Sequence, residues 1–314
     1  MTSERHELLS KVAYYYYVKD NSQATIAKEL NVHRTTVSRL LKEAREQGVV
    51  NIQIKGFNKE LFDLEQMAKK VYDLKYLEIV PSAHENSEND LRRLIGRKAA
   101  KLMHRIIKDD DNVGVSWGSS LATTVKYVEK KDTENTIFFP LVGGSTDINP
   151  SDHINTLVYK LSDKFNGNSL FINASAIQET PKVATGIIDS KYFLELKSCW
   201  ENLDKAIVGI GGELGVEDSS WRYLLDKHDY ETVKQNNIIG DCCCQFFDEK
   251  GVILKGDLND RTIGIGLERL QEVPTSIGIA YGNDKVKAIR AVLENGYINS
   301  LVTDEKTLRS VLQD

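Results

Sequence analysis

A short stretch near the start of the chain carries side chains suited to contact a nucleic acid. They are His33, Arg34, Thr35, Thr36, Ser38, Arg39 and Lys42, and Gln23 opens the helical pattern just before them. Arginine can hydrogen bond to guanine in the major groove, while threonine and serine contact bases or phosphates. This composition predicts a DNA-binding helix. The alternative is a helical hairpin whose charged face is only solvated.

The apolar pattern around these residues predicts a helix-turn-helix. Ser22 is a suitable N-cap for a helix from Gln23 to Leu30, and Asn31 tolerates the left-handed backbone of a tight turn. A second helix is expected from Arg34 to Gln47, ending at Gly48. The positions expected to be buried are Ile26, Leu30, Val32, Val37 and Leu40, with the small Ala27 where the helices cross. In this motif the start of the second helix enters the major groove of double-stranded DNA.

The residues after the motif set the domain boundary. Val49 to Gly56 alternates apolar and polar residues, which predicts a wing strand packed on the helices. We therefore expect a winged helix-turn-helix domain over residues 1–56 and a second domain over residues 57–314. In the second domain Leu61, Leu64, Ala68 and Val71 repeat at three-four spacing. This helix either packs on its own domain or forms a dimer.

Charge is divided unevenly between the two parts. The chain has 314 residues and a net charge of −5, but its first 56 residues hold nine basic and six acidic residues, which gives +3 for the head and −8 for the rest. A basic head on an acidic body indicates a polyanion-binding module attached to another function.

Cysteine usage and hydropathy exclude other classes of protein. Cys199 and the adjacent Cys242, Cys243 and Cys244 lack the C-x-x-C spacing of a zinc site, so we expect no metal and no cofactor. The three adjacent cysteines are expected in a strand. No apolar run reaches the roughly 20 residues that cross a bilayer. The N-terminus lacks the apolar stretch of a signal peptide, so we expect a cytoplasmic protein without a membrane partner.

From Tyr76 onward, strand patterns alternate with helical patterns. This alternation predicts an α/β domain with a parallel sheet and helices on both faces. Four strands end in small-residue loops, at residues 117–120, 142–145, 210–212 and 281–283. Because ligands bind at the carboxyl ends of such strands, the loops predict a small-anion site. A hairpin is also expected over residues 238–254, with its turn at Glu249-Lys250-Gly251.

The polar residues of this region have distinct expected roles. Gly118-Ser119-Ser120 leads directly into a helix, whose free N–H groups and two hydroxyls can hold a phosphate. Lys285 can pair with a phosphate, and the cluster Asn259, Asp260 and Arg261 suits the hydroxyls of a sugar. For Arg261 and Lys285 the alternative is an ordinary solvated surface charge.

Taken in order, these pieces resemble the SorC family of bacterial sugar-responsive regulators over essentially the whole chain. The likeness rests on "SQATIAKELNVHRTTVSRLLKEAREQGVV" at the head and on "VGVSWGSS", "PLVGG", "WENLDKAIVGIG", "GDCCCQFF" and "YINSLVT" in the body. "HINTLVYKL" and "SIGIAYGNDK" most resemble the sorbose-operon branch. The resemblance implies a Rossmann-like effector domain related to phosphosugar isomerases. It also implies a tetramer and control by a sugar or sugar phosphate, which for this branch is sorbose or its phosphate.

The resemblance also assigns effector residues. They are Gly118, Ser119 and Ser120 in the phosphate loop, Gly143, Gly144 and Ser145 in a second loop, and Lys285. A deoxyribonucleoside-operon relative has in the second loop a lysine that bonds covalently to its sugar. Here that position is Val142, so a Schiff base is not expected at this position.

Two functions of different classes follow from these observations. The resemblance favours a DNA-binding transcriptional regulator of a carbohydrate operon, controlled by a bound sugar or sugar phosphate. The alternative is a phosphosugar isomerase with an appended DNA-binding head, which needs a positioned general base. Glu179, Asp241 and Asp260 are candidates for that base, but no spacing selects one. We therefore expect no enzyme and assign no catalytic residue.

Overall fold

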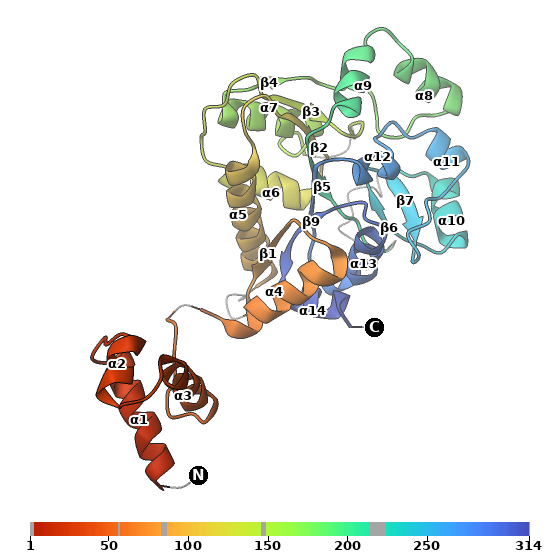
Figure 1. The fold of residues 1–314 in the computed structure, drawn as a ribbon. Helices are drawn as coiled ribbons and strands as arrows, with labels where there is room; N and C mark the ends of the chain where they lie inside the picture. The colour runs from red at the N-terminus through yellow and green to blue at the C-terminus, as the bar shows by residue number, and fades with distance from the viewer. Residues whose placement is uncertain (1–2, 56, 83–86, 146–148, 214–223, 314) are drawn as a thin grey trace. The chain divides into compact units, whose positions relative to one another are not determined.

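The computed structural model describes residues 3–55, 57–82, 87–145, 149–213 and 224–313. The chain divides into two compact units, Met1–Asn58 and Lys59–Asp314. The first unit is built from helices, and the second contains a parallel sheet (Figure 1).

The N-terminal unit has the predicted helix-turn-helix, formed by α2 (Gln23–Glu29) and α3 (Arg34–Glu46) and preceded by α1 (Ser3–Tyr17). Ser22 caps α2 by accepting a 3.1 Å hydrogen bond from the Thr25 amide. Asn31 has a φ of +52°, the left-handed backbone that the turn requires. Leu9, Val12, Ile26, Val37 and Leu40 are buried together between the three helices. Arg5 Nε donates to Glu43 Oε1 at 3.0 Å, which ties α1 to α3.

The predicted wing strand is wrong for the residues that the structure describes. The Val50 amide donates to the Ala44 carbonyl at 3.0 Å, and residues 51–54 then continue without regular secondary structure. The alternation of residue types is present, but a strand needs a neighbouring strand for its hydrogen bonds. The described part of this unit contains only helices and loops.

Seven strands of the C-terminal unit form one parallel sheet in the order β1-β9-β8-β5-β2-β3-β4, as the α/β pattern predicts. They are β1 (Tyr76–Val80), β2 (Asn112–Val115), β3 (Ile137–Pro140), β4 (Asn168–Ser169), β5 (Lys205–Gly209), β8 (Thr275–Ile279) and β9 (Ser300–Asp304). The chain runs outward from β2 to β4 in one direction and from β5 to β9 in the other. The strand order therefore reverses between β2 and β5, where such sheets bind ligands.

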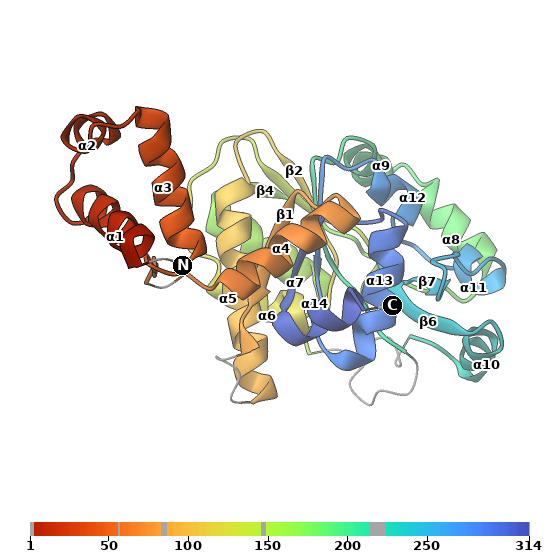
Figure 2. The same ribbon diagram turned by 60° about the horizontal axis from the view of Figure 1, so that its bottom comes forward.

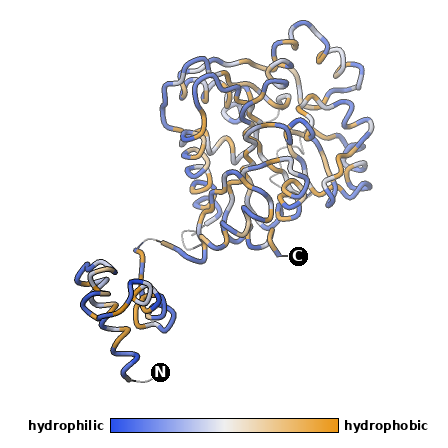
Figure 3. The backbone as a smooth tube through the Cα atoms, in the orientation of Figure 1, coloured by the Kyte–Doolittle hydropathy of each residue, from blue (hydrophilic) through white to orange (hydrophobic). Residues whose placement is uncertain are grey.

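Helices flank this sheet in two groups (Figures 1 and 2). The first group is α5 (Glu88–Ile106), α6 (Ser119–Tyr127) and α7 (Ile154–Phe165), and the second is α4 (Lys59–Tyr72), α13 (Val286–Glu294) and α14 (Glu305–Val311). Leu64 and Ala68 of α4 are buried in the core of this unit, so the helix packs on its own domain. Apolar stretches of the chain gather inside this unit (Figure 3).

Shorter elements lie in the connections between strands. They are α8 (Pro181–Ile188), α9 (Leu194–Glu201), α10 (Lys227–Gln235), α11 (Asp257–Asp260), α12 (Leu267–Gln271) and the 3-10 helix η3 (Asn283–Lys285). No helix in the described ranges is long and apolar enough to cross a membrane.

The predicted hairpin is present, but its turn is elsewhere. β6 (Ile238–Cys242) pairs antiparallel with β7 (Gln245–Asp248), and Cys243 and Cys244 form the turn with φ of +54° and +59°. Residues at positive φ in such turns are usually Asn or Gly, so the cysteines gave no turn signal. The expected site, where Gly251 has a φ of +77°, is a second reversal that brings Ile253 back to Phe247.

Candidate functional site

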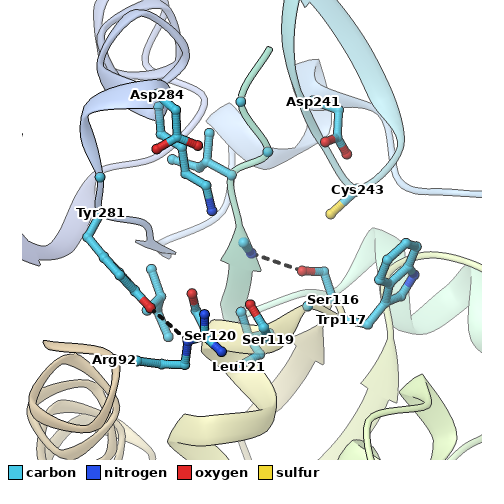
Figure 4. Close-up of a pocket in the computed structure, with 18 of the residues that line it drawn as sticks. Arg92, Ser116, Trp117, Ser119, Ser120, Leu121, Asp241, Cys243, Tyr281 and Asp284 are labelled. Carbon is cyan, nitrogen blue, oxygen red and sulfur yellow. Dashed lines mark hydrogen bonds between the residues drawn. The ribbon is translucent and has the colours of Figure 1, made fainter. Parts of the chain in front are cut away.

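A cavity of about 450 Å³ opens at the carboxyl ends of β2, β5 and β8, beside the reversal in strand order (Figure 4). The loop after β2 contributes residues 116–120, the loop after β5 residues 210–213, and the loop after β8 residues 281, 282, 284 and 285. α5 adds residues 88, 91 and 92, and the β6–β7 hairpin adds residues 241, 243 and 244. Three of the four predicted small-residue loops therefore converge on one site, and the fourth contributes Val142 alone.

The start of α6 gives the cavity an anion-binding end. Gly118 is the N-cap of α6, with a φ of +136° that strongly favours glycine, and no side chain caps the helix there. Ser119 is exposed and Ser120 is largely buried, and both line the cavity. Uncapped N–H groups and the helix dipole favour a negatively charged ligand group at this point.

Two cations line the cavity. Arg92, on α5, donates from Nε to the Tyr281 hydroxyl at 3.2 Å and from Nη2 to Glu88 at 3.1 Å. Figure 4 shows Arg92 and Tyr281 beside Ser119 and Ser120. Lys285 lines the cavity from the end of η3. Its pKa is lowered, because burial outweighs the opposing charges of Asp284 and Asp241. An arginine beside a helix N-terminus, with a lysine in the same cavity, suits a phosphate.

Asp241 gives the cavity a different polar group, which lies across from Arg92 and Tyr281 in Figure 4. Its carboxyl is buried and accepts a 3.2 Å hydrogen bond from the Cys244 amide. Burial raises the pKa of Asp241 to about 6, and the Cys244 amide and the Lys285 charge oppose this shift. A carboxylate in this wall can accept hydrogen bonds from ligand hydroxyls.

The two cysteines of the hairpin turn form a neutral part of the wall. Burial raises the pKa of the Cys244 thiol. The pKa of Cys243 is raised mainly by a hydrogen bond with Cys242 and, second, by burial. Both thiols are therefore protonated and poorly nucleophilic.

Comparison with known proteins places this fold and cavity in a family. Residues 58–313 match the family model described as "Putative sugar-binding domain". The sorbitol operon regulator of Klebsiella pneumoniae is 32% identical over 314 residues, which are 99% of each chain. The chain belongs to the SorC family of transcriptional regulators.

Other relatives of this SorC-family chain agree. The full-length crystal structure of the Klebsiella sorbitol operon regulator superposes with a TM-score of 0.78 over 98% of each chain. A transcriptional regulator from Streptococcus pneumoniae TIGR4 is 38% identical, with a TM-score of 0.77 over 81% of this chain and 97% of that one. The deoxyribonucleoside regulator of Bacillus subtilis strain 168 is 28% identical over the full length of both. These relatives are regulators and not enzymes, so the isomerase alternative is set aside.

The second predicted effector loop of this SorC-family chain lies behind the cavity wall. Gly143, Gly144 and Ser145 are buried and are not among the lining residues, although Val142 is. The Gly143 carbonyl accepts a 3.0 Å hydrogen bond from the Trp117 indole, and its amide donates to Ile263 at 2.9 Å. A Cβ at Gly143 would lie 2.5 Å from the backbone of Ser175 and Ala176. This loop holds the Trp117 ring in the wall.

The polar cluster predicted for sugar hydroxyls also lies outside the cavity lining. Asn259 and Asp260 belong to α11, and Arg261 follows it. Arg261 is buried, contrary to the surface-charge alternative, and pairs with Asp229 and with Asp257, the latter at 2.6 Å. Its Nη1 also donates to the Gln178 carbonyl at 2.9 Å. These bonds join α10, α11 and the loop before α8, so the arginine has a structural role.

Sequence reasoning missed some lining residues. Arg92 lies within a helix rich in charged residues and had no local signal. Asp241 was considered only as a general base, and Tyr281 only as part of a loop. Lys285, by contrast, lines the cavity together with Ser119 and Ser120 as expected.

The helix predicted to contact DNA presents its polar side chains outward. Arg34, Thr35, Ser38, Arg39 and Lys42 are exposed on α3. The opposite face, Val37, Leu40, Leu41 and Ala44, is buried against α1 and α2. Among the other predicted contacts, Thr36 and Gln23 are half-buried, and His33 is the exposed N-cap of α3.

Proposed function

We propose that this SorC-family regulator binds its operator through α3 and that a sugar phosphate bound in the cavity controls this binding. The supporting observation is that one cavity holds groups suited to both the phosphate and the hydroxyls of such a ligand. The uncapped start of α6, with Arg92 and Lys285, suits the phosphate, and Asp241 suits hydroxyls. A volume of about 450 Å³ is in the range of small-molecule sites.

The sugar is proposed from the relatives. One relative is named for the sorbitol operon, and the sequence motifs resemble the sorbose branch. We therefore propose a six-carbon polyol or ketose, phosphorylated at one end, as the effector. Val142 in the wall leaves no lysine at that position to form a Schiff base with a carbonyl, so we propose non-covalent binding there.

A charge placed at the start of α6 tests this site. Ser119→Glu sets a carboxylate against the ligand phosphate, whereas Ser119→Gln is a matched control of similar size without the charge. Calorimetric titration with sorbitol, sorbose and their phosphates should show Ser119→Glu binding the phosphate roughly tenfold or more weakly, with a smaller loss for Ser119→Gln. Both variants should keep operator affinity in the absence of ligand. Equal affinity of the wild type and Ser119→Glu would place the phosphate elsewhere.

A homo-oligomer is proposed for the assembly, because one helix-turn-helix contacts only a half-site, and the SorC-family resemblance makes a tetramer the proposed form. Paired heads on a pseudo-palindromic operator supply the missing sequence information.

A further inference from the structure

The segment that follows the helix-turn-helix has the composition of a strand but no strand partner. Residues 51–55 are all exposed, and Ile52 and Ile54 leave 56% and 63% of their surfaces accessible. Alternate residues of a β-strand share a face, so pairing of this segment as a strand would place Val50, Ile52 and Ile54 on one face. Val50 packs partly against the core of the helical unit. The exposed isoleucines therefore extend an apolar face that begins in that core.

Backbone N–H and C=O groups of this segment are also free to form hydrogen bonds with another strand. The Val50 amide donates to the Ala44 carbonyl in the last turn of α3, and the next backbone hydrogen bond runs from the Phe57 amide to the Ile54 carbonyl. Between them, Asn51, Ile52 and Gln53 form no hydrogen bond with the described part of the N-terminal unit. Extended backbone with free donors and acceptors is a template for pairing with another strand.

We propose that residues 51–55 of two copies of this chain pair antiparallel and form a two-stranded ribbon between subunits. The sequence is self-complementary about Gln53. With the two-fold axis at that residue, Ile52 faces Ile54 of the partner subunit and Asn51 faces Lys55 of the partner subunit. This register matches apolar with apolar residues and keeps the two lysines apart. A register centred on Lys55 would place like charges directly opposite each other.

A second copy fits this surface better than an unrelated strand. Isologous pairing uses the same patch on both subunits, as a two-fold axis requires. The ribbon lies directly after α3 in the chain, so pairing it would hold two DNA-binding helices at a fixed relation, as a palindromic operator demands. This surface does not involve the cavity, so it stands independently of the proposed ligand.

Cysteine cross-linking of the full-length protein tests the register. In the proposed ribbon, two Gln53 residues have Cα atoms about 4.5–5.5 Å apart, within the range of a disulfide. Two Lys55 residues lie about 14 Å apart, since they are four residues out of register. Gln53→Cys and Lys55→Cys change exposed positions and leave the fold intact, and the wild type controls for the four native cysteines.

With copper-phenanthroline as oxidant, Gln53→Cys should run mainly as a disulfide-linked dimer on a non-reducing gel. Lys55→Cys and the wild type should remain monomeric under the same conditions. A monomeric Gln53→Cys overturns the ribbon. Equal cross-linking of both variants also overturns it, because a freely moving segment would give that result.

Discussion

At the scale of single residues, the buried Asp241 carboxyl makes the stability of the folded protein depend on pH. Burial raises its pKa to about 6 from an ordinary value of 3.8. Between these values the folded protein binds a proton that the unfolded chain does not, so the free energy of unfolding falls as pH rises through this window. Above it, the buried charge costs roughly 3 kcal/mol.

We therefore expect Asp241→Asn to raise the melting temperature at neutral pH and to flatten its fall between about pH 4 and pH 6. The Asn carbonyl can still accept the hydrogen bond from the Cys244 amide. Thermal unfolding across this range measures the effect, with Asp284→Asn, an exposed carboxylate that also lines the cavity, as the control. Parallel pH profiles for the wild type and Asp241→Asn would contradict a buried charge.

Local signals among residues were enough to find part of the cavity. Glycine and two serines between a strand and a helix suit an anion site at a helix N-terminus, and four such loops in one domain strengthened that prediction, so Gly118, Ser119 and Ser120 could be named without a structure. Arg92 could not, because its place depends on how α5 lies against the strand ends. Arg261 was misassigned because its buried partner Asp229 is 32 residues away in the chain.

At the scale of elements, α3 is the helix that we propose contacts DNA. Its buried face fixes which side chains remain outside, and Arg39 and Lys42 lie one turn apart on that outer face. We expect Arg39→Ala to cost roughly 1–3 kcal/mol of specific binding if Arg39 contacts a base. Lys42→Ala should weaken binding to all DNA sequences by a similar factor and lower the salt dependence of the affinity.

Gel-shift titrations on operator and scrambled DNA at several salt concentrations separate these two effects. Lys11→Ala, which removes one exposed positive charge from α1, is the control. If Arg39→Ala and Lys42→Ala both bind the operator like the wild type, another surface contacts the DNA.

Whether a segment forms a helix or a strand was predictable wherever the pattern of neighbouring residues determines it. The period of apolar residues and the turn residues gave the two helices of the helix-turn-helix and the strand-helix alternation. The errors arose where the pairing of one strand with another determines the structure. Residues 51–54 have a strand pattern without a strand partner, and Cys243-Cys244 turns because β6 and β7 must meet.

At the scale of the whole molecule, one chain joins a DNA-binding unit to a ligand-binding unit. A regulator needs the two equilibria to be coupled, and such coupling is reciprocal. If the effector changes operator affinity by a given factor, the operator must change effector affinity by the same factor. If the two binding sites were not coupled, binding of one ligand would leave the affinity for the other unchanged, which is a coupling factor of one.

We expect a coupling factor of roughly 5 to 150 between the operator and the sugar phosphate. Operator affinity is measured by fluorescence anisotropy with and without saturating effector, and effector affinity by calorimetry on free and operator-bound protein. The two ratios should agree. Ser119→Glu should lose the effect of the sugar phosphate on operator binding while keeping the operator affinity of the free protein, since its substitution lies in the C-terminal unit. An effector that binds free and operator-bound wild type equally would show that the cavity does not control DNA binding.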